Sequence, residues 1–409
     1  MAGQRIKNLA AFLGLDRSIA GLLGMVVLVG LGERLAERFL PLYLVALGGG
    51  ALSVGLLNGL DNLLSALYSF PGGYLSDRLG VKKALLIFNL MAMTGFATVI
   101  LIPAWPAVIA GAVLFLSWTA ISLPATMSLV AQVLPKNKRT MGVSLHSLVR
   151  RVPMALGPLL GGLFIGWWGE KDGIRLAFGA ALGFALVALI MQQKMIREDG
   201  RKEDGPSVRP ESNPLRALAG MSPDLKNLLV SDILIRFCEQ IPYAFVVLWA
   251  VKTIIAPVSA FQFGILTAVE MVTALLIYIP VAYFADRGTK KPFVLLTFVF
   301  FTLFPLALLF SHSFWPLAAA FVLRGFKEFG EPTRKALIMD LAPEGKKAAT
   351  FGVYYLIRDV VVSLAAFGGA FLWLISPEVN FLSAFGFGVL GTVWFALKGK
   401  DVGTDGRQS

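Results

Sequence analysis

The chain of 409 residues is 56% hydrophobic and only 15% charged, and its mean hydropathy is +0.73. Because soluble domains carry about 25% charged residues, this composition excludes an ordinary soluble protein and predicts an integral membrane protein. Apolar stretches long enough to cross a bilayer recur from end to end, which a single cleaved signal peptide would not produce.

The formal net charge of +12 does not indicate a nucleic-acid partner, because the Lys and Arg residues lie mostly in short loops between apolar stretches. Cys238 is the single cysteine, so no intrachain disulfide can form. With only His146 and His312 beside it, the sequence offers no Cys/His cluster of metal-ligand spacing, and we expect no metal and no other cofactor.

We predict an all-α fold of about twelve transmembrane helices in two pseudo-symmetric halves. The apolar segments are 19–47, 52–75, 82–103, 105–132, 141–166, 174–193, 226–250, 259–285, 293–311, 314–340, 350–375 and 379–397. Residues 194–225 are rich in charge, Gly and Pro, which is typical of a solvated linker. The expected organisation is therefore an N-terminal six-helix bundle at 1–193, a linker at 194–225 and a C-terminal six-helix bundle at 226–409.

Basic residues in alternate loops predict the topology. They are Arg78, Lys82, Lys83, Lys136, Lys138, Arg139, Arg287, Lys290, Lys291, Lys346 and Lys347. The other loops, such as IPAWPA and HSFWP, lack Lys and Arg. By the positive-inside rule, we expect both termini and the linker to be cytoplasmic in a multi-pass protein of a plasma membrane or inner membrane.

An internal repeat relates the two halves. GLLNGLDNLLSALYSFPGGYLSDRLGVKK aligns with GILTAVEMVTALLIYIPVAYFADRGTKK at a constant offset. The alignment pairs Gly55 with Gly264, Asp61 with Glu270, Pro71 with Pro280 and Asp77 with Asp286. RLAE from Arg34 likewise has a counterpart in RFCE from Arg236, so Glu37 corresponds to Glu239. The halves are therefore repeats of each other.

One loop of this repeat resembles the signature of the major facilitator superfamily, G-x-L-x-D-R-x-G-x-K/R-K/R. Its residues here are Gly73, Leu75, Asp77, Arg78, Gly80, Lys82 and Lys83. The resemblance covers essentially the whole chain and implies that Asp77 and Arg78 form a conformational latch on the cytoplasmic side. The second copy is degenerate, since Ala282 replaces the first Gly and Asp286-Arg287-Gly288 has lost the spacer residue before the last Gly.

A second stretch, Gly157-Pro158-Leu-Leu-Gly161-Gly162, resembles the end of the fifth-helix signature of the family's antiporters. That resemblance implies export by antiport. The alternative is that these glycines serve only close packing between helices.

Charged residues also lie inside two predicted spans. Glu33, Arg34, Glu37 and Arg38 fall within a helical wedge of about 140° in the first span. In the tenth, Arg324, Lys327, Glu328, Glu331, Arg334 and Lys335 share one side of the wheel. Such charges are costly in lipid, so we expect them to line a polar pathway; the alternative is a buried ladder of salt bridges.

Depth along each predicted span, at about 1.5 Å per residue, suggests further neighbours. Arg34 and Asp61 come out at a similar height and are expected to lie close together. Arg150, Arg324 and Arg358 come out near the bilayer midplane, where such folds bind substrates, so this region is predicted to be net positive.

Asp61 and Glu270 have no basic residue within four positions, and a carboxylate without a cation tends to keep its proton. They are the predicted proton carriers, with Glu270 the cleaner candidate if Arg34 reaches Asp61; either could instead make only a polar contact between helices. Arg150 and Arg358, equivalent in the repeat, could clamp an anion or pair with Glu33 or Glu328. Arg236 and Glu239 complete the predicted pathway.

The leading hypothesis is a secondary transporter that exports an amphipathic or anionic organic compound in exchange for protons. Its partners would be a small-molecule substrate, a proton or a sodium ion, and the lipid bilayer; the resemblance implies a monomer. A proton symporter that imports a metabolite, or a sensor or lipid-moving protein on the same scaffold, remains open. An enzyme is not expected, because the sequence shows neither a nucleophile with its base nor a P-loop.

Overall fold

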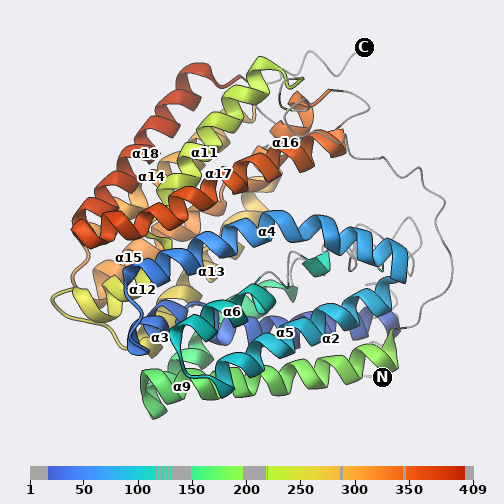
Figure 1. Ribbon diagram of the computed structural model, residues 1–409. Coiled ribbons are helices and arrows are strands. Elements are labelled where there is room, and N and C mark those ends of the chain that lie inside the picture. The colour runs from blue at the N-terminus through green and yellow to red at the C-terminus, as the bar shows by residue number, and fades with distance from the viewer. Residues whose placement is uncertain are drawn as a thin grey trace, which may run out of the picture. The chain divides into compact units, whose positions relative to one another are not determined.

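The computed structural model describes residues 17–116, 149–196, 220–285, 289–343 and 347–400, with single positions at 118, 121–123, 126, 129 and 218. The side chains of 17–18, 69–73, 77, 278–285 and 347–349 lie outside this description. Within it, every regular element is helical (Figure 1), and seven helices are long and apolar enough to cross a bilayer. An eighth span results if the bent pair Pro223–Tyr243 and Val246–Thr253 is counted as one. The predicted all-α membrane fold is confirmed.

The chain divides into two compact units. The first consists of Met1–Gly49 and Leu64–Gly205, and the second of Gly50–Leu63 and Pro206–Ser409. Helix α4 (Ala51–Leu79) therefore contributes its first part to the second unit. This division differs from the predicted halves by assigning 50–63 to the second unit, and the two six-helix bundles stay a prediction.

The first unit is built around two long helices. Helix α2 (Arg17–Glu37) packs most extensively against α9 (Arg151–Met195), and α5 (Val81–Leu101) packs against both α6 (Trp105–Phe115) and α9 (Figure 1). A short helix, α3 (Leu40–Ala46), follows α2. Helix α9 is kinked at Gly169, whose φ of 77° is left-handed. This kink separates the spans predicted at 141–166 and 174–193.

Two glycines allow the close approach of α2 and α9. A Cβ at Gly157 would fall 2.5 Å from the Cβ of Arg34, and one at Gly161 would overlap the carbonyl oxygen of Leu35. The GPxxGG stretch therefore lies directly against the charged turn of α2, which any larger side chain would push away.

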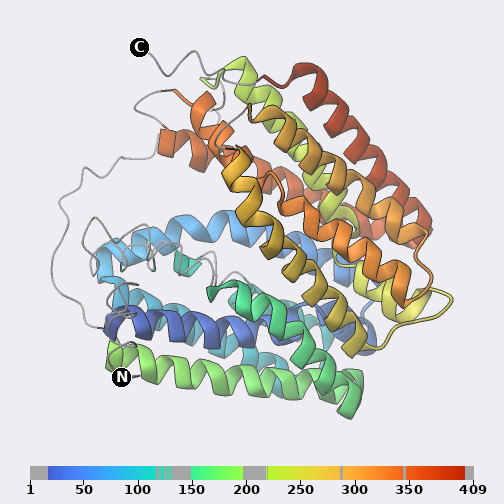
Figure 2. The ribbon, with the colours of Figure 1, turned by 180° about the vertical axis from the view of Figure 1, so that it is seen from behind.

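In the second unit, helix α11 (Pro223–Tyr243) packs against three other helices (Figure 2). They are α17 (Lys347–Ile375), α18 (Pro377–Lys398) and α14 (Lys291–Leu309). Helix α13 (Ala260–Ala285) packs against α15 (Phe314–Gly325). The remaining elements are α12 (Val246–Leu248), the π-helix Trp249–Thr253, the 3₁₀ helix η3 (Phe326–Glu328) and α16 (Glu331–Leu341).

The starts of α11 and α18 follow a common sequence pattern. Ser222 and Ser376 each accept a hydrogen bond from a backbone N–H in the first turn, and a proline follows each serine. These serines cap N–H groups that have no partner inside the helix, while proline fits the first helical position.

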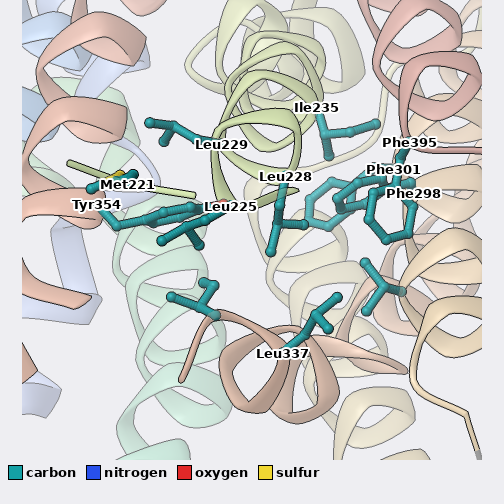
Figure 3. Close-up of a cluster of buried hydrophobic side chains, with 12 residues drawn as sticks. Met221, Leu225, Leu228, Leu229, Ile235, Phe298, Phe301, Leu337, Tyr354 and Phe395 are labelled. Carbon is teal, nitrogen blue, oxygen red and sulfur yellow. The ribbon is translucent and has the colours of Figure 1, made fainter. Parts of the chain in front are cut away.

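A hydrophobic cluster joins these helices (Figure 3). The rings of Phe298 and Phe395 meet edge to face with centroids 5.2 Å apart, beside Phe301 and Leu228. Tyr354 lies at the other end of the cluster, next to Leu225. Through Tyr354, this apolar cluster adjoins the polar groups described below.

Two predicted spans are discontinuous. The segment 19–47 breaks after Glu37, with Pro41 in the first turn of α3, and 314–340 breaks between Gly325 and Glu331, ahead of Pro332. Proline cannot donate the hydrogen bond of a helix interior and disfavours helical backbone before it. The charge stripe from Arg324 to Lys335 therefore does not lie on one continuous helix, as the helical wheel assumed.

Candidate functional site

A network of buried ion pairs runs through the second unit. Glu270 on α13, whose side chain is 1% exposed, lies 3.1 Å from Arg324 Nε and 3.2 Å from Lys327 Nζ. Lys327 also donates a 2.9 Å hydrogen bond to Glu239 on α11. The break between α15 and α16 thus places Lys327 between two carboxylates from different helices.

The network continues along α11. Glu239 accepts a 2.6 Å hydrogen bond from Arg236, one helical turn earlier. Arg236 also lies 3.5 Å from Glu331, which accepts two hydrogen bonds from Arg334, at 2.7 and 2.8 Å. Glu331 therefore connects α11 with α16.

Asp232 ends this chain of contacts in the centre of the unit. Its carboxylate pairs with Arg334, lies 3.3 Å from Arg358 Nη1 and accepts a 3.1 Å hydrogen bond from the hydroxyl of Tyr354. Arg358 also donates a 2.7 Å hydrogen bond to its neighbour Asp359. One buried aspartate thus joins α11, α16 and α17.

Aromatic rings surround the cations of the network. The guanidinium of Arg324 lies 4.9 Å from the ring centre of Phe304 and 5.4 Å from that of Tyr243. Arg236 lies 5.3 Å from Phe301, and Arg358 lies 4.2 Å from Tyr355. Each ring presents its negative face or excludes water, which strengthens the ion pairs inside.

The buried part of the network is electrically balanced. Its five cations are Arg236, Arg324, Lys327, Arg334 and Arg358, and its five anions are Asp232, Glu239, Glu270, Glu331 and Asp359. Lys335, whose side chain is half exposed, adds a further contact with Glu331 at 3.5 Å. The prediction that Arg324 and Arg358 create a net positive region is therefore wrong for this unit. The sequence does not show this balance because each of these cations contacts at least one carboxylate that is distant in sequence.

Two further expectations need correction. Glu270 is not remote from cations, because Arg324 and Lys327 reach it from another helix. Arg358 pairs with Asp232 and Asp359 rather than with Glu328, which lies in η3. Sequence neighbours alone could not show the contacts of Glu270 with Arg324 and Lys327, or that of Arg358 with Asp232.

The first unit repeats part of this arrangement. Arg34 donates a 2.7 Å hydrogen bond to Glu37 on α2, as Arg236 does to Glu239 on α11. The aligned sequences RLAE and RFCE therefore form the same ion pair in both units, at the same spacing of three residues.

A small pocket of about 20 Å³ lies beside this ion pair, with room for a water molecule or one small polar group. Its lining consists of Val26, Gly30, Glu33, Arg34, Trp118, Ser122, Leu123, Thr126, Arg150, Pro153 and Met154. The structure thus brings three predicted site residues of the first unit, Glu33, Arg34 and Arg150, into one pocket.

The signature loop is described in part. Gly80 has a φ of 86° and precedes α5, a left-handed turn that favours glycine. Arg78 is exposed and donates a 3.3 Å hydrogen bond to the hydroxyl of Tyr74. The surroundings of Gly73, the side chain of Asp77, and both Asp286 and Arg287 lie outside the described residues, so the latch stays a prediction.

Asp61 belongs to the second unit and Arg34 to the first, so their expected proximity also stays a prediction. Of the antiporter-like stretch, Gly157, Pro158, Gly161 and Gly162 are all buried in α9. The contacts of Gly157 and Gly161 with α2 are those that close helix packing requires.

Sequence reasoning missed Asp232, the residue on which three helices converge. It lies in the apolar segment 226–250, four residues before Arg236. The rule applied to the first and tenth spans, that a charge inside an apolar segment faces a partner or a cavity, would have found it.

Comparisons with known proteins agree with this architecture. The sequence profile of the Major Facilitator Superfamily matches residues 22–256 and again 228–408. The chain belongs to the major facilitator superfamily. The two matches of the superfamily profile together cover residues 22–408, nearly the whole sequence.

Individual relatives of this superfamily member are distant. An uncharacterised MFS-type transporter of Methanocaldococcus jannaschii is 23% identical over 360 residues, which cover 84% of this chain and 85% of the relative. A homologue of the multi-drug resistance efflux pump PmrA from Lactococcus lactis is 24% identical over 380 residues, covering 90% and 91%.

Solved structures share the superfamily fold. The nucleoside transporter NupG matches with a TM-score of 0.79 at 14% identity, covering 94% of this chain and all of that one. The peptide transporter POT in complex with sulfate matches with a TM-score of 0.75 at 15% identity, covering 94% of each chain. These structures are similar to this chain in fold only. The protein is therefore a secondary transporter of a small molecule in a membrane, and not an enzyme.

Proposed function

We propose that the protein exports an amphipathic or anionic organic compound in exchange for protons. The observation that carries the proton coupling is the position of Lys327 between two buried carboxylates, at 2.9 Å from Glu239 and 3.2 Å from Glu270. This geometry allows one ammonium group to serve either glutamate.

Charge balance explains how such a pair couples to transport. Protonation of Glu270 would remove one negative charge from a buried network that is otherwise neutral, and uncompensated charge in such a site is costly. The ammonium group of Lys327 would then pair with Glu239 alone, or an anionic substrate would replace the lost negative charge. The two glutamates form a coupled pair, so proton uptake belongs to the pair rather than to one residue.

Two observations support export. The GPxxGG stretch resembles the signature of antiporters, and one distant relative is a homologue of a multi-drug resistance efflux pump. A symporter that imports a metabolite would use the same network, so the direction of solute and proton movement decides between the two.

The test uses purified protein in liposomes that contain a pH-sensitive dye and carry an imposed proton gradient. The liposomes are challenged with pooled organic anions and lipophilic cations. We expect a compound-dependent proton flux in the wild type, opposite in direction to the compound, and loss of this flux in Glu270→Gln.

The matched control is Glu378→Gln, because Glu378 is exposed in the first turn of α18 and lies outside the network. Its flux should equal that of the wild type. Flux that persists unchanged in Glu270→Gln would refute coupling through this glutamate, and movement of compound and proton in the same direction would establish symport instead.

A further inference from the structure

The strongest feature that the proposed function does not use is the contact between Arg236 and Glu331. Arg236 donates a 2.6 Å hydrogen bond through Nη1 to Glu239, while its Nη2 lies 3.5 Å from Glu331, which is longer than the usual hydrogen bond of about 2.9 Å. Its Nε is buried and makes no hydrogen bond to a described residue. The guanidinium of Arg236 is therefore shared unequally between two carboxylates, and one of its donors is unused.

Lys327 is shared in a similar way. Its Nζ lies 2.9 Å from Glu239 and 3.2 Å from Glu270. Glu239 is thus the carboxylate that both cations contact. We call the series Glu331, Arg236, Glu239, Lys327 and Glu270 the shared-cation chain. Because Arg236 and Lys327 compete for one carboxylate, closer pairing of Arg236 with Glu239 makes Lys327 more available to Glu270.

Glu331, at one end of the shared-cation chain, is held by contacts other than that with Arg236. It is the first residue of α16 and accepts two hydrogen bonds from Arg334, one turn later. The preceding Gly330 donates a hydrogen bond to the hydroxyl of Thr297 on α14, and a Cβ at Gly330 would overlap the carbonyl oxygen of Phe293. The packing of α16 on α14 therefore fixes where the carboxylate of Glu331 lies.

We propose, building on the proposed function, that Glu331 is a positioning residue for the proton-sensitive pair. Its fixed carboxylate draws Arg236 partly away from Glu239, which keeps Lys327 shared between Glu239 and Glu270. Through these two intervening cations, Glu331 sets the pH at which Glu270 takes up a proton.

The charged groups around Glu270 define the route of this effect. Arg324 of α15 and Lys327 of η3 contact it directly. Glu239 of α11 contacts Lys327, and Glu328 of η3 attracts Lys327 electrostatically. Of these groups, Glu239 and Lys327 belong to the shared-cation chain, so the chain acts on Glu270 through them.

Infrared spectroscopy of the purified protein in lipid measures this proton uptake directly. The absorption band of protonated carboxyl groups is recorded against pH, and the part that disappears on adding Glu270→Gln to each variant belongs to Glu270. In Glu331→Gln, Arg236 pairs with Glu239 alone and Lys327 moves toward Glu270, so the midpoint of this band should fall by about one pH unit. In Arg236→Gln, Glu239 retains Lys327 and the midpoint should rise.

A double variant separates the shared-cation chain from a general change of charge. If Glu331 acts through Arg236, Arg236→Gln/Glu331→Gln should titrate as Arg236→Gln does, within about 0.3 pH unit, whereas an effect through space would add its full shift. The matched control is Asp340→Asn, which removes a carboxylate from the same helix. Asp340 pairs with Lys290, outside the shared-cation chain, so its midpoint should equal that of the wild type.

Glu331→Asp tests the same contact with the charge retained. The shorter side chain lengthens the contact with Arg236, so the midpoint should fall by less than in Glu331→Gln. Melting temperatures verify that the variants are folded. An unchanged midpoint in Glu331→Gln, the same shift with and without Arg236, or an equal shift in Asp340→Asn would each overturn this role, as would a carboxyl band that does not depend on Glu270 at any pH.

This test does not depend on transport. A midpoint that Glu331 sets, without compound-dependent proton flux in liposomes, would refute the proposed coupling and leave the positioning role standing. Proton flux that is lost in Glu270→Gln, together with an unchanged midpoint in Glu331→Gln, would do the reverse.

Discussion

Both units contain the same type of ion pair, between an arginine and a glutamate three residues later, but the surroundings of the pair differ. In the second unit, the pair Arg236 and Glu239 extends on both sides into a network that joins helices α11, α13, α16 and α17. In the first unit, the pair Arg34 and Glu37 lies beside a pocket that contains Arg150.

This difference teaches that a sequence repeat does not impose a repeated site. In the second unit, Arg236 and Glu239 have further charged partners on other helices, whereas in the first unit a pocket lined by Glu33, Arg34 and Arg150 lies beside the pair. The proposed function assigns the proton-sensitive pair to the second unit alone.

The largest expected effect comes from breaking the centre of the network. Asp232→Asn leaves Arg334 and Arg358 without their shared carboxylate, and loss of one member of a buried ion pair costs about 3–5 kcal/mol. Denaturant titration in mixed micelles measures this free energy of unfolding. The control Asp224→Asn removes an exposed pair with Lys400, which should cost no more than about 1 kcal/mol; similar losses in both variants would contradict the central role of Asp232.

The equivalent arginines provide a direct comparison between the units. Arg358→Gln breaks contacts with Asp232 and Asp359 and should reduce the free energy of unfolding by about 3 kcal/mol. Arg150→Gln breaks no ion pair within 4.0 Å among the described residues and weakens only the longer-range attraction of the buried Glu33, so it should cost less, about 1 kcal/mol. The same denaturant titration compares them, and equal destabilisation would show that Arg150 is held as firmly as Arg358.

A smaller effect tests the packing that positions the pocket. A Cβ at Gly161 would overlap the carbonyl oxygen of Leu35, so Gly161→Ala should cost about 1–3 kcal/mol by overpacking. Gly179, on the same helix, has open space around it, so Gly179→Ala should leave stability unchanged or slightly raise it. Melting temperatures measured side by side compare the two, and an unchanged value for Gly161→Ala would show that α2 and α9 separate easily.

Much of the fold was predictable because it depends on local composition. Apolar stretches of sufficient length cross a membrane as helices, and the repeat around Asp77 and Asp286 indicated two related halves. The breaks after Glu37 and before Glu331 were visible as Pro41 and Pro332, but the hydrophobicity of the flanking residues outweighed them in the prediction of continuous spans.

Most members of the site were predictable, except Asp232 and Asp359, but the pairs that they form were not. Glu270 has no basic sequence neighbour, yet Arg324 and Lys327 contact it from another helix. Counting residues along each span placed Arg150, Arg324 and Arg358 at a similar depth in the membrane. That count does not show which carboxylates on other helices lie beside them.

The sequence by itself therefore determined that this protein is a helical membrane transporter with charges inside its spans, because hydrophobic length, repeat and motif are properties of the chain. Only the tertiary structure decided which of those charges neutralise one another and that Arg150 shares a pocket with Glu33 and Arg34. The physical reason is that an ion pair depends on a few ångströms between side chains of different helices, and that distance is fixed by how the helices pack.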